Sequence, residues 1–175
     1  MRIETKRLIL RHFTKSDFEQ LHAFASDSEN VQYMDWGPNS ENDTNSFLRD
    51  VQTTYQATPR KAYEFAVILK STNQLIGSCG IRIQSSINRH GDFGYILSKA
   101  YWNQGLGKEL AAELVRFGFS DLKLHRIWAT CAPDNIASQK VLERIGLKKE
   151  GHLRQNIFHR GQWRDSCLYS ILEVD

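Results

Sequence analysis

Two glycines separated by one residue stand where a strand-like segment gives way to an amphipathic one, in Trp102-Asn-Gln-Gly-Leu-Gly-Lys-Glu109. Gly105 and Gly107 have no Cβ, so backbone N–H groups at this point can approach a bound phosphate closely. The positive end of the dipole of the following helix favours the same negative charge. The spacing therefore predicts an anion site, and we expect a ligand that carries phosphate.

Two longer phosphate motifs do not fit this segment. A dinucleotide-binding fingerprint needs a third glycine at position 110, which is Leu110. A P-loop needs glycine at position 102 and Ser or Thr at position 109, where this chain has Trp102 and Glu109. The short Gly-x-Gly form that remains is also an ordinary turn, so other segments must decide between a phosphate loop and a turn.

Six further segments accompany this loop in a fixed order: Thr5-Lys-Arg-Leu-Ile-Leu-Arg11, Leu124-His-Arg-Ile-Trp-Ala-Thr130, Asn135-Ile-Ala-Ser138, Leu142-Glu-Arg-Ile-Gly-Leu147, Glu150-Gly-His-Leu-Arg154 and Asp165-Ser-Cys-Leu-Tyr-Ser-Ile-Leu172. With 102–109, they resemble the GNAT family of N-acetyltransferases over nearly the whole chain. The resemblance is greatest to the branch that acetylates protein N-termini, including the ribosomal-protein alanine acetyltransferases. Gly107-Lys108 departs from that branch, which often has Ala and a small hydroxyl residue there.

The resemblance implies that acetyl-CoA is the co-substrate and that no metal takes part. In the family, the strand before the glycine loop holds the pantetheine arm through its backbone, and the loop holds the pyrophosphate. Carried over residue by residue, the cofactor-binding set is Tyr95, Ile96, Leu97, Asn103, Gln104, Gly105, Leu106, Gly107, Lys108, Asn135 and Ser138.

The segment after Pro133 carries two polar residues on an apolar stripe. Asn135, Ser138 and Leu142 are offset by 0, 3 and 7, so Ser138 faces inward if the segment is helical. From the residues alone, Ser138 is equally well a small packing residue and Asn135 a helix-start residue. The resemblance implies that Asn135 contacts the cofactor arm and that Ser138 donates towards the CoA sulfur, with Tyr95 or Tyr101 as alternative acids.

A general base is harder to identify. An α-amine with a pKa of ~8 is about a tenth neutral at pH 7, whereas a lysine side chain at ~10.4 is neutral in fewer than about one molecule in a thousand. An α-amine acceptor therefore needs little help. Glu150, at the start of a family-like segment, is the candidate base, with His125 and His152 as weaker candidates. An ion-paired surface glutamate and structural histidines are the alternative interpretations.

Aromatic residues crowd the segment between the first two predicted helices. Tyr33, Met34, Asp35 and Trp36 are expected to form the acceptor pocket, facing the sheet across the cofactor. Asp35 would bind the acceptor ammonium, although an aspartate that forms a turn is equally plausible.

Periodicity predicts the elements that must position these residues. Apolar patterns predict strands at 2–13, 62–69, 75–83, 92–98, 125–131 and 163–172, the last paired with the residues after Glu150. Helical spacing predicts helices over 18–25, 40–55, 104–120 and 134–145. The order predicts an α/β (α+β) protein with a mixed sheet flanked by helices. The resemblance implies the GNAT fold, whose twisted, mostly antiparallel sheet is splayed at the cofactor site.

Length and composition limit the other possibilities. A chain of 175 residues with 41% hydrophobic content fills one core, so we expect a single domain over 1–175. The charged N-terminus has no apolar run behind it, and no stretch approaches the about 20 apolar residues of a membrane span, so we expect a cytoplasmic protein without membrane contact.

Cysteines and charge indicate neither metal nor nucleic acid. Cys79, Cys131 and Cys167 are widely spaced in apolar surroundings, which favours buried free thiols. The formal charge of +3 comes with scattered basic residues and no dense block, which is not the pattern of a nucleic-acid-binding protein.

Taken together, the sequence and the resemblance favour an enzyme that moves acetyl from acetyl-CoA directly to a primary amine. The expected partner is a protein N-terminus, such as that of a ribosomal protein. A small-molecule acceptor (a polyamine, an amino acid or an aminoglycoside) is one alternative, and a non-catalytic acyl-CoA-binding sensor is the other. Monomer and homodimer are both left open.

Overall fold

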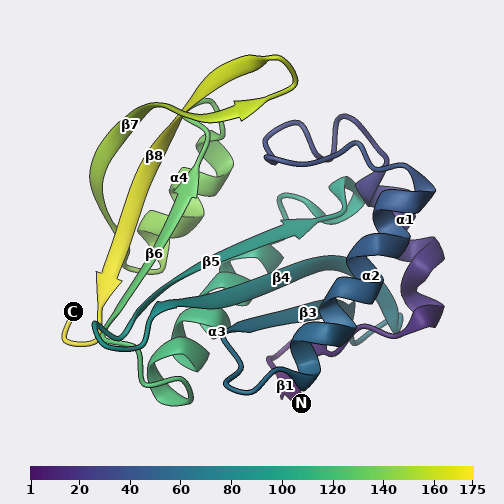
Figure 1. The fold of residues 1–175 in the computed structure, drawn as a ribbon, viewed down its shortest axis with the longest axis horizontal. Helices are drawn as coiled ribbons and strands as arrows, with labels where there is room; N and C mark the ends of the chain where they lie inside the picture. The colour runs from purple at the N-terminus through teal and green to yellow at the C-terminus, as the bar shows by residue number, and fades with distance from the viewer.

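The computed structural model describes residues 1–175 and arranges eight strands in one sheet, in the order β1-β2-β3-β4-β5-β6-β8-β7 (Figure 1). All neighbouring strands are antiparallel except β5 and β6, which are parallel. The strands are β1 (Arg2–Glu4), β2 (Leu8–Arg11), β3 (Ala62–Leu69), β4 (Gln74–Ser85), β5 (His90–Leu97), β6 (Arg126–Cys131), β7 (Lys148–His159) and β8 (Gln162–Leu172).

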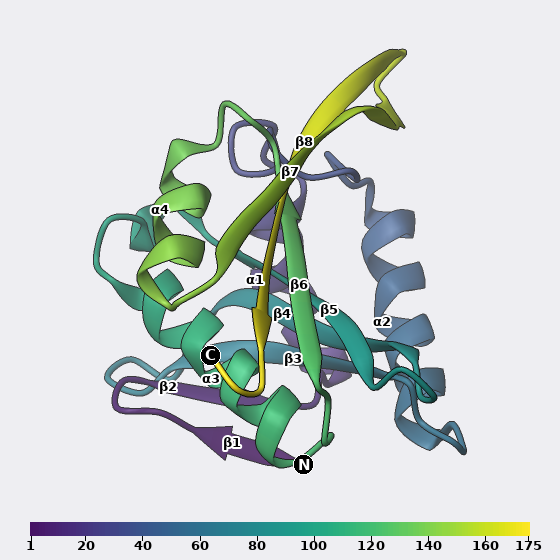
Figure 2. The same ribbon diagram turned by 90° about the vertical axis from the view of Figure 1, so that its left-hand side faces the viewer.

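Four helices cover the two faces of the sheet, with α2 on one side and α3 and α4 on the other in Figure 2. They are α1 (Phe18–Ala25), α2 (Glu41–Gln56), α3 (Leu106–Ser120) and α4 (Ile136–Arg144), with short 3-10 turns η1 (Lys15–Asp17) and η2 (Lys99–Tyr101). No helix combines the length and the apolar character that a membrane crossing demands.

Alternation along the strands divides the core into two apolar clusters, one on each face. Phe65, Phe93 and Leu97 pack with the α3 residues Leu106, Leu110 and Leu114. Ala66 and Ile96 pack on the opposite face with residues of α1 and α2. Because side chains alternate along a strand, Tyr95 is turned to the α3 face, whereas Glu64 and Gly94 are turned to the α1–α2 face.

Strands β5 and β6 start together and then diverge, as Figure 1 shows. They pair over His90↔Arg126, Gly91↔Ile127 and Asp92↔Trp128, and no pairing continues beyond Asp92. The remainder of β5, from Phe93 to Leu97, stays paired with β4 alone. The sheet is therefore split into a V whose open end lies between Leu97 and Cys131.

Helix α3 lies against the sheet where the V opens. Its apolar residues Leu106, Leu110, Leu114 and Phe117 are buried, as their helical spacing predicts. Gly118 allows the close approach, because a Cβ there would lie 2.5 Å from Cδ1 of Ile127. The helix is thereby fixed with its N-terminus beside the end of β5.

Two predicted boundaries are wrong. The single strand expected at 2–13 is two strands, because the chain reverses between Thr5 and Arg7 and pairs Arg2 with Arg11. This turn contains neither glycine nor proline, so the alternation of apolar residues masks it. The helix expected at 104–120 begins at Leu106, because Gly105 has a left-handed backbone (φ 74°). The three cysteines are buried free thiols, as predicted.

Candidate active site

The candidate site lies at the open end of the V between β5 and β6. Backbone groups of β5 that point towards β6 beyond Asp92 have no strand partner, so they are free to bind an extended ligand. Tyr95 and Ile96, two of the predicted cofactor contacts, lie in the part of β5 that is paired with β4 but not with β6. Ile96 is paired with Ser78 two positions from the hydrogen bond between the Ser98 N–H and the Ile76 carbonyl, so its backbone groups point to β4, its side chain is buried in the α1–α2 cluster, and a contact with the cofactor stays a prediction.

The carbonyl of Leu97 is already occupied. Nε1 of Trp102 donates to it at 2.8 Å, and Nδ2 of Asn30 approaches it at 3.4 Å. The side-chain oxygen Oδ1 of Asn30 in turn accepts from the backbone N–H of Lys99 at 2.6 Å. Trp102 and Asn30 therefore fix the turn that carries the chain from β5 to α3, and this oxygen of Leu97 is not free for a cofactor.

The first turn of α3 has backbone N–H groups without side-chain partners. Gly105 is the N-cap residue and makes no side-chain cap. An uncapped helix start presents its N–H groups and the positive end of its dipole to a ligand. Leu106 is buried, so only its backbone faces the ligand side, whereas Asn103, Gln104 and Lys108 are exposed around the turn.

The packing within the protein leaves room for a Cβ at Gly107. A Cβ built there would lie 3.4 Å from Cε2 of Tyr95, which is an ordinary contact. At Gly105 the nearest atom would be Nη2 of Arg7 at 3.6 Å, although its φ of +74° still favours glycine. Because Gly107 has no side chain, its backbone is open to close approach by a phosphate.

A partly buried hydrogen-bond network supports this turn. The Glu109 carboxylate accepts from the Thr5 hydroxyl at 2.5 Å, from the backbone N–H of Arg7 at 2.7 Å and from Nε of Arg7 at 2.7 Å. Nη1 of the same Arg7 donates to the carbonyl of Gln104 at 2.8 Å. Thr5 and Arg7 thus connect the β1–β2 turn to both ends of the glycine segment.

Three polar side chains meet beside the V on the α3–α4 face. Ser138 lies near the Tyr95 hydroxyl and near the Cys131 thiol at the end of β6, and its hydroxyl lowers the pKa of both groups against the effect of burial. Burial raises the pKa of Tyr95 to about 12 and that of Cys131 to about 11. Both groups keep their protons at neutral pH. Ser138 faces inward as its spacing predicts, and Tyr95 is placed to donate together with it.

Asn135 performs the helix-start role that its residue type indicates. Its side-chain oxygen accepts from the backbone N–H of Ser138 at 3.0 Å and so caps α4. This bond also fixes the first turn of α4, which carries Ser138. Asn135 therefore orients Ser138, and a direct contact with the cofactor stays a prediction.

The surroundings of Glu150 do not favour a base. Both of its oxygens accept from the guanidinium of Arg126, and its side chain is 38% exposed. The hydrogen bonds from Arg126 and Ser170 lower the pKa of Glu150 to about 2. A carboxylate held this strongly in its charged form has little tendency to take a proton at neutral pH. The arrangement matches the ion-paired alternative.

The other candidate acids and bases lie in separate surroundings. The Tyr101 hydroxyl donates to Gln74 at 2.9 Å. His125 lies 3.8 Å from Glu173 near the C-terminus, at the closed end of the V. Nε2 of His152 lies 2.5 Å from Asp165, and both border a hollow of about 660 Å³ in the β7–β8 hairpin.

The predicted acceptor segment lies on the α1–α2 face and is tied to the β7–β8 hairpin. Met34 and Trp36 pack on the α1–α2 cluster, Tyr33 is half-buried, and Asp35 is exposed. Nη2 of Arg164 donates to the Met34 carbonyl at 3.1 Å, and Nη1 approaches the Gln32 carbonyl at 3.3 Å.

Arg160 makes a second tie between the hairpin and this segment. Its Nη2 donates to the Gly37 carbonyl at 3.1 Å and approaches that of Val31 at 3.4 Å. Figure 1 shows the hairpin beside the loop between α1 and α2. The two arginines therefore hold one wall of the expected acceptor pocket.

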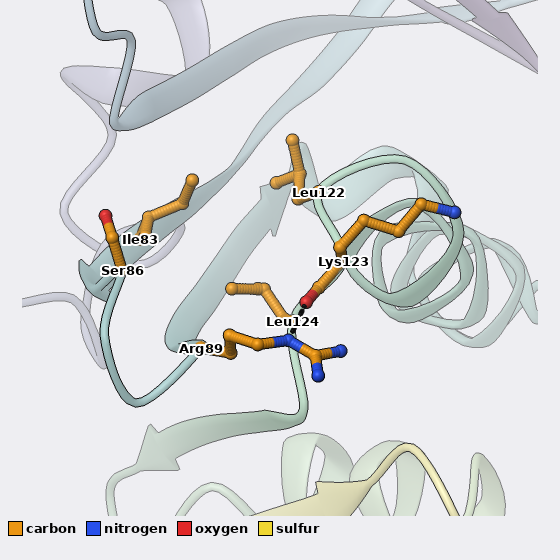
Figure 3. Close-up of a pocket in the computed structure, with 6 residues that line it drawn as sticks. All are labelled: Ile83, Ser86, Arg89, Leu122, Lys123 and Leu124. Carbon is orange, nitrogen blue, oxygen red and sulfur yellow. Dashed lines mark hydrogen bonds between the residues drawn. The ribbon is translucent and has the colours of Figure 1, made fainter.

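Another hollow, of about 210 Å³, lies away from these residues. It is lined by Ile83, Ser86, Arg89, Leu122, Lys123 and Leu124 (Figure 3). Nε of Arg89 donates to the Lys123 carbonyl at 2.7 Å, as the dashed line in Figure 3 shows, and Nη2 pairs with Glu173. The one guanidinium in the hollow is thus already bonded, and the hollow lies at the closed end of the V.

Sequence reasoning missed four residues that shape the site: Arg7, Glu109, Arg160 and Arg164. Thr5 and Arg7 lie in a segment that resembles the family, and this resemblance was the one indication in the sequence that they contribute to the site. Their partner Glu109 lies more than a hundred positions away, and no pattern in one sequence pairs the two. The arginines of the hairpin bind backbone carbonyls, which leave no trace in the sequence.

Comparisons with known proteins agree with this geometry. Residues 7–148 match the family model for an acetyltransferase (GNAT) domain. YnaD, an uncharacterized N-acetyltransferase of Bacillus subtilis (strain 168), is 33% identical over 176 residues, covering 100% of this chain and 99% of YnaD. The ribosomal protein uS5-alanine N-acetyltransferase of Escherichia coli (strain K12) is 32% identical over 82 residues, covering 47% of this chain and 42% of that enzyme.

A solved structure extends the similarity to the whole fold. The crystal structure of a GNAT-family acetyltransferase from Bacillus anthracis superposes with a TM-score of 0.87 at 34% identity, covering 100% of both chains. The V between β5 and β6 and the open start of α3 are therefore parts of a fold shared with that acetyltransferase. The chain belongs to the GNAT family and is an N-acetyltransferase that uses acetyl-CoA as its acetyl donor.

Proposed function

We propose that this enzyme acetylates the α-amine at the N-terminus of a protein, such as a ribosomal protein, and that residues 1–175 act as one catalytic domain. The observation that supports acetyl-CoA binding in this proposal is the uncapped start of α3 at Gly105, which lies beside the end of β5 that does not pair with β6. In this arrangement the pyrophosphate of acetyl-CoA binds Gly105, Leu106, Gly107 and their neighbours. The pantetheine arm then runs through the V along β5.

Two observations support a polypeptide acceptor. The first is the similarity, over about half of the chain, to an enzyme that acetylates ribosomal protein uS5. The second is an exposed aromatic pair near the end of the β7–β8 hairpin. Phe158 and Trp163 are 61% and 59% exposed, and their ring centroids lie 5.1 Å apart. Exposed aromatic pairs beside a site are typical of surfaces that bind another protein chain.

The chemistry needs only modest help from the protein. An α-amine is about a tenth neutral at pH 7, so a weak base is enough to supply the nucleophile. The nitrogen attacks the thioester carbon, the C–S bond breaks, and the thiolate gains a proton. Ser138, together with Tyr95, is the proposed donor to the sulfur, since both side chains lie on the α3–α4 face beside the V and the Tyr95 hydroxyl keeps its proton at neutral pH.

The first experiment is calorimetric titration of the protein with acetyl-CoA, followed by thiol release with a panel of acceptors. The panel contains peptides with N-terminal Ala, Ser and Met, the same peptides with blocked N-termini and an internal lysine, and polyamines, amino acids and aminoglycosides. We expect saturable binding and release that requires a free N-terminus. Release with the polyamine, amino-acid or aminoglycoside arm alone would replace the protein acceptor with a small molecule.

A binding-deficient variant makes the titration decisive. Gly107→Val adds a side chain to the proposed phosphate turn, at a position where a Cβ makes only an ordinary contact with the Tyr95 ring. We expect folding to be retained and the acetyl-CoA dissociation constant to rise at least tenfold. Equal affinity in the two proteins would refute the loop assignment. Binding by wild type without thiol release from any amine would instead indicate an acyl-CoA sensor.

A further inference from the structure

The α1–α2 face of the sheet carries a glutamate that no part of the site described above uses. Glu64 lies in β3, opposite Gly80 of β4, which in turn lies opposite Gly94 of β5. Residues paired across neighbouring strands share a face, so all three positions are on the side of the acceptor segment. Gly94 is also the second residue of β5 beyond the last pair with β6.

The two glycines clear a path from Glu64 to the V. A Cβ on Gly80 would lie 2.1 Å from Oε2 of Glu64, so the carboxylate extends directly over the Gly80 backbone. At Gly94 a Cβ would meet nothing within 4 Å. Since neighbouring strands lie about 4.8 Å apart, the space over Gly94 is one strand away from the carboxylate. A side chain at either position would fill this path.

The carboxylate of Glu64 is poorly satisfied for a group with a side chain only 19% exposed. No hydrogen bond reaches either oxygen, and the nearest cation, Nε of Arg82, lies 3.7 Å from Oε1. Glu109 and Glu150, by contrast, each accept several hydrogen bonds. A half-buried carboxylate without donors is well suited to receive a proton.

The charges around Glu64 agree with that role. Burial raises the pKa of the Glu64 carboxyl and Asp92 adds to the increase, while Arg82 and the more distant Arg60 oppose it. On the α2 side, the neutral Tyr55 hydroxyl donates to the Glu64 backbone carbonyl at 3.1 Å and does not contact the carboxylate. The net direction moves the group towards the range in which a carboxylate exchanges protons near neutral pH.

We propose that Glu64 is the general base of the acetyl transfer, and this proposal rests on the proposed transfer to an amine. The acceptor ammonium lies over Gly94 on the α1–α2 face and gives one proton to Glu64, directly or through one water. The neutral nitrogen then attacks the thioester carbon and forms the C–N bond. The C–S bond breaks, and the leaving sulfur takes a proton from the Ser138–Tyr95 donors. The nitrogen loses its second proton to water, and water returns a proton to the donors.

The test compares wild type with Glu64→Gln, which keeps size and shape but removes the base. We expect kcat/KM for the acceptor at pH 7 to fall by about 10²- to 10⁴-fold, the usual contribution of general base catalysis. The loss should shrink as the pH rises and the amine becomes neutral without help. The acetyl-CoA dissociation constant should stay within twofold. Because burial disfavours the charge, the variant should melt no lower than wild type.

Two further variants distinguish a base from a structural role. Glu150→Gln, a change of the same chemistry on the ion-paired glutamate, should leave the acid side of the pH profile as in wild type. Gly94→Ala places a methyl group in the empty space and should raise KM for the acceptor without changing acetyl-CoA affinity.

Three outcomes separate the hypotheses. A Glu64→Gln enzyme with wild-type kcat/KM and pH profile would overturn the proposal for Glu64 alone. A fall in acetyl-CoA affinity that parallels the fall in rate would indicate a structural role and would also overturn it. A wild-type protein that binds acetyl-CoA but acetylates no amine would refute the proposed function itself.

Discussion

The network behind the glycine turn should control affinity for the nucleotide half of acetyl-CoA. Glu109 has a side chain that is 17% exposed, and it accepts hydrogen bonds from Thr5 and from two N–H groups of Arg7. Arg7 in turn holds the Gln104 carbonyl. In Glu109→Gln an amide nitrogen replaces one acceptor oxygen, so at least one Arg7 donor loses its partner.

The size of the effect follows from the kind of bond lost. A hydrogen bond to a charged group contributes about 1.5–3 kcal/mol, and an unpaired donor at a partly buried position adds to the loss. If about 2 kcal/mol of this is needed to reorder the turn on binding, the dissociation constant for acetyl-CoA rises roughly 30-fold. Acetyl-pantetheine lacks the pyrophosphate, so its affinity should change less than about twofold.

A matched control lies one turn further along α3. Glu113 has a side chain that is 15% exposed and pairs with Arg116 at 2.7 Å, but it does not contact the turn. Titrations of Glu109→Gln and Glu113→Gln with both ligands should separate the two positions. Equal losses for acetyl-CoA and acetyl-pantetheine, or equal effects of the two substitutions, would refute the argument.

The same carboxylate predicts a pH dependence. Burial alone would raise the pKa of Glu109, but the hydrogen bonds from Thr5 and Arg7 outweigh it and hold the pKa below its usual value of 4.5. A lowered pKa in the folded state stabilises the fold above the unfolded value, and this stabilisation is lost as the pH falls through the folded value. Acid denaturation of Glu109→Gln should therefore lose part of the wild-type slope below about pH 4.5.

Three further perturbations follow from single contacts. Gly77→Ala would put a Cβ 2.2 Å from the carbonyl oxygen of Ile96, so it should lower the free energy of unfolding, measured by urea denaturation, by about 2 kcal/mol or more. A decrease below about 0.5 kcal/mol would be inconsistent with this close approach. Arg164→Ala removes the hydrogen bonds between the β7–β8 hairpin and the acceptor segment, and it should raise the KM for the acceptor several-fold at constant acetyl-CoA affinity. An unchanged KM in steady-state kinetics would contradict the role of this segment as a wall of the acceptor pocket. Asp17→Asn breaks a two-bond ion pair with Arg11 and should cost about 2–3 kcal/mol by urea unfolding; an unaltered midpoint would show that the pair contributes little.

Local patterns were sufficient for most of the fold. The helical stripe of α3 and the buried strand β6 each show their period within a dozen residues, so their predictions are confirmed. The β1–β2 turn was missed because it is stabilised by Thr5, whose backbone N–H donates to the Leu8 carbonyl at 3.0 Å. A reversal of this kind interrupts no apolar alternation, so periodicity alone cannot detect it.

The cofactor side of the site was also largely readable, for a physical reason. A phosphate is bound by backbone N–H groups, and the residues that expose them are glycines, which are visible in a sequence. The Gly105-Leu-Gly107 segment could therefore be predicted before any contact was known. The hydrogen bond from Trp102 to the Leu97 carbonyl could not be predicted, because the partner of an indole N–H depends on the folded structure and not on the sequence around it.

The proposed base Glu64 is recognised by strand register, which a single sequence does not show, and sequence reasoning therefore favoured Glu150. In the sequence Glu150 begins a family-like segment, whereas Glu64 lies within an apolar strand and reads as an ordinary polar position of β3. What distinguishes Glu64 is the alignment Glu64↔Gly80↔Gly94 across three strands. A one-residue slip of β4 would place a side chain under the carboxylate and close the path to the V. The proposed base is therefore positioned by two residues that have no functional group. Gly80→Ala would displace the carboxylate, and kcat/KM for the acceptor should fall towards that of Glu64→Gln, while an unchanged kcat/KM would contradict this reasoning.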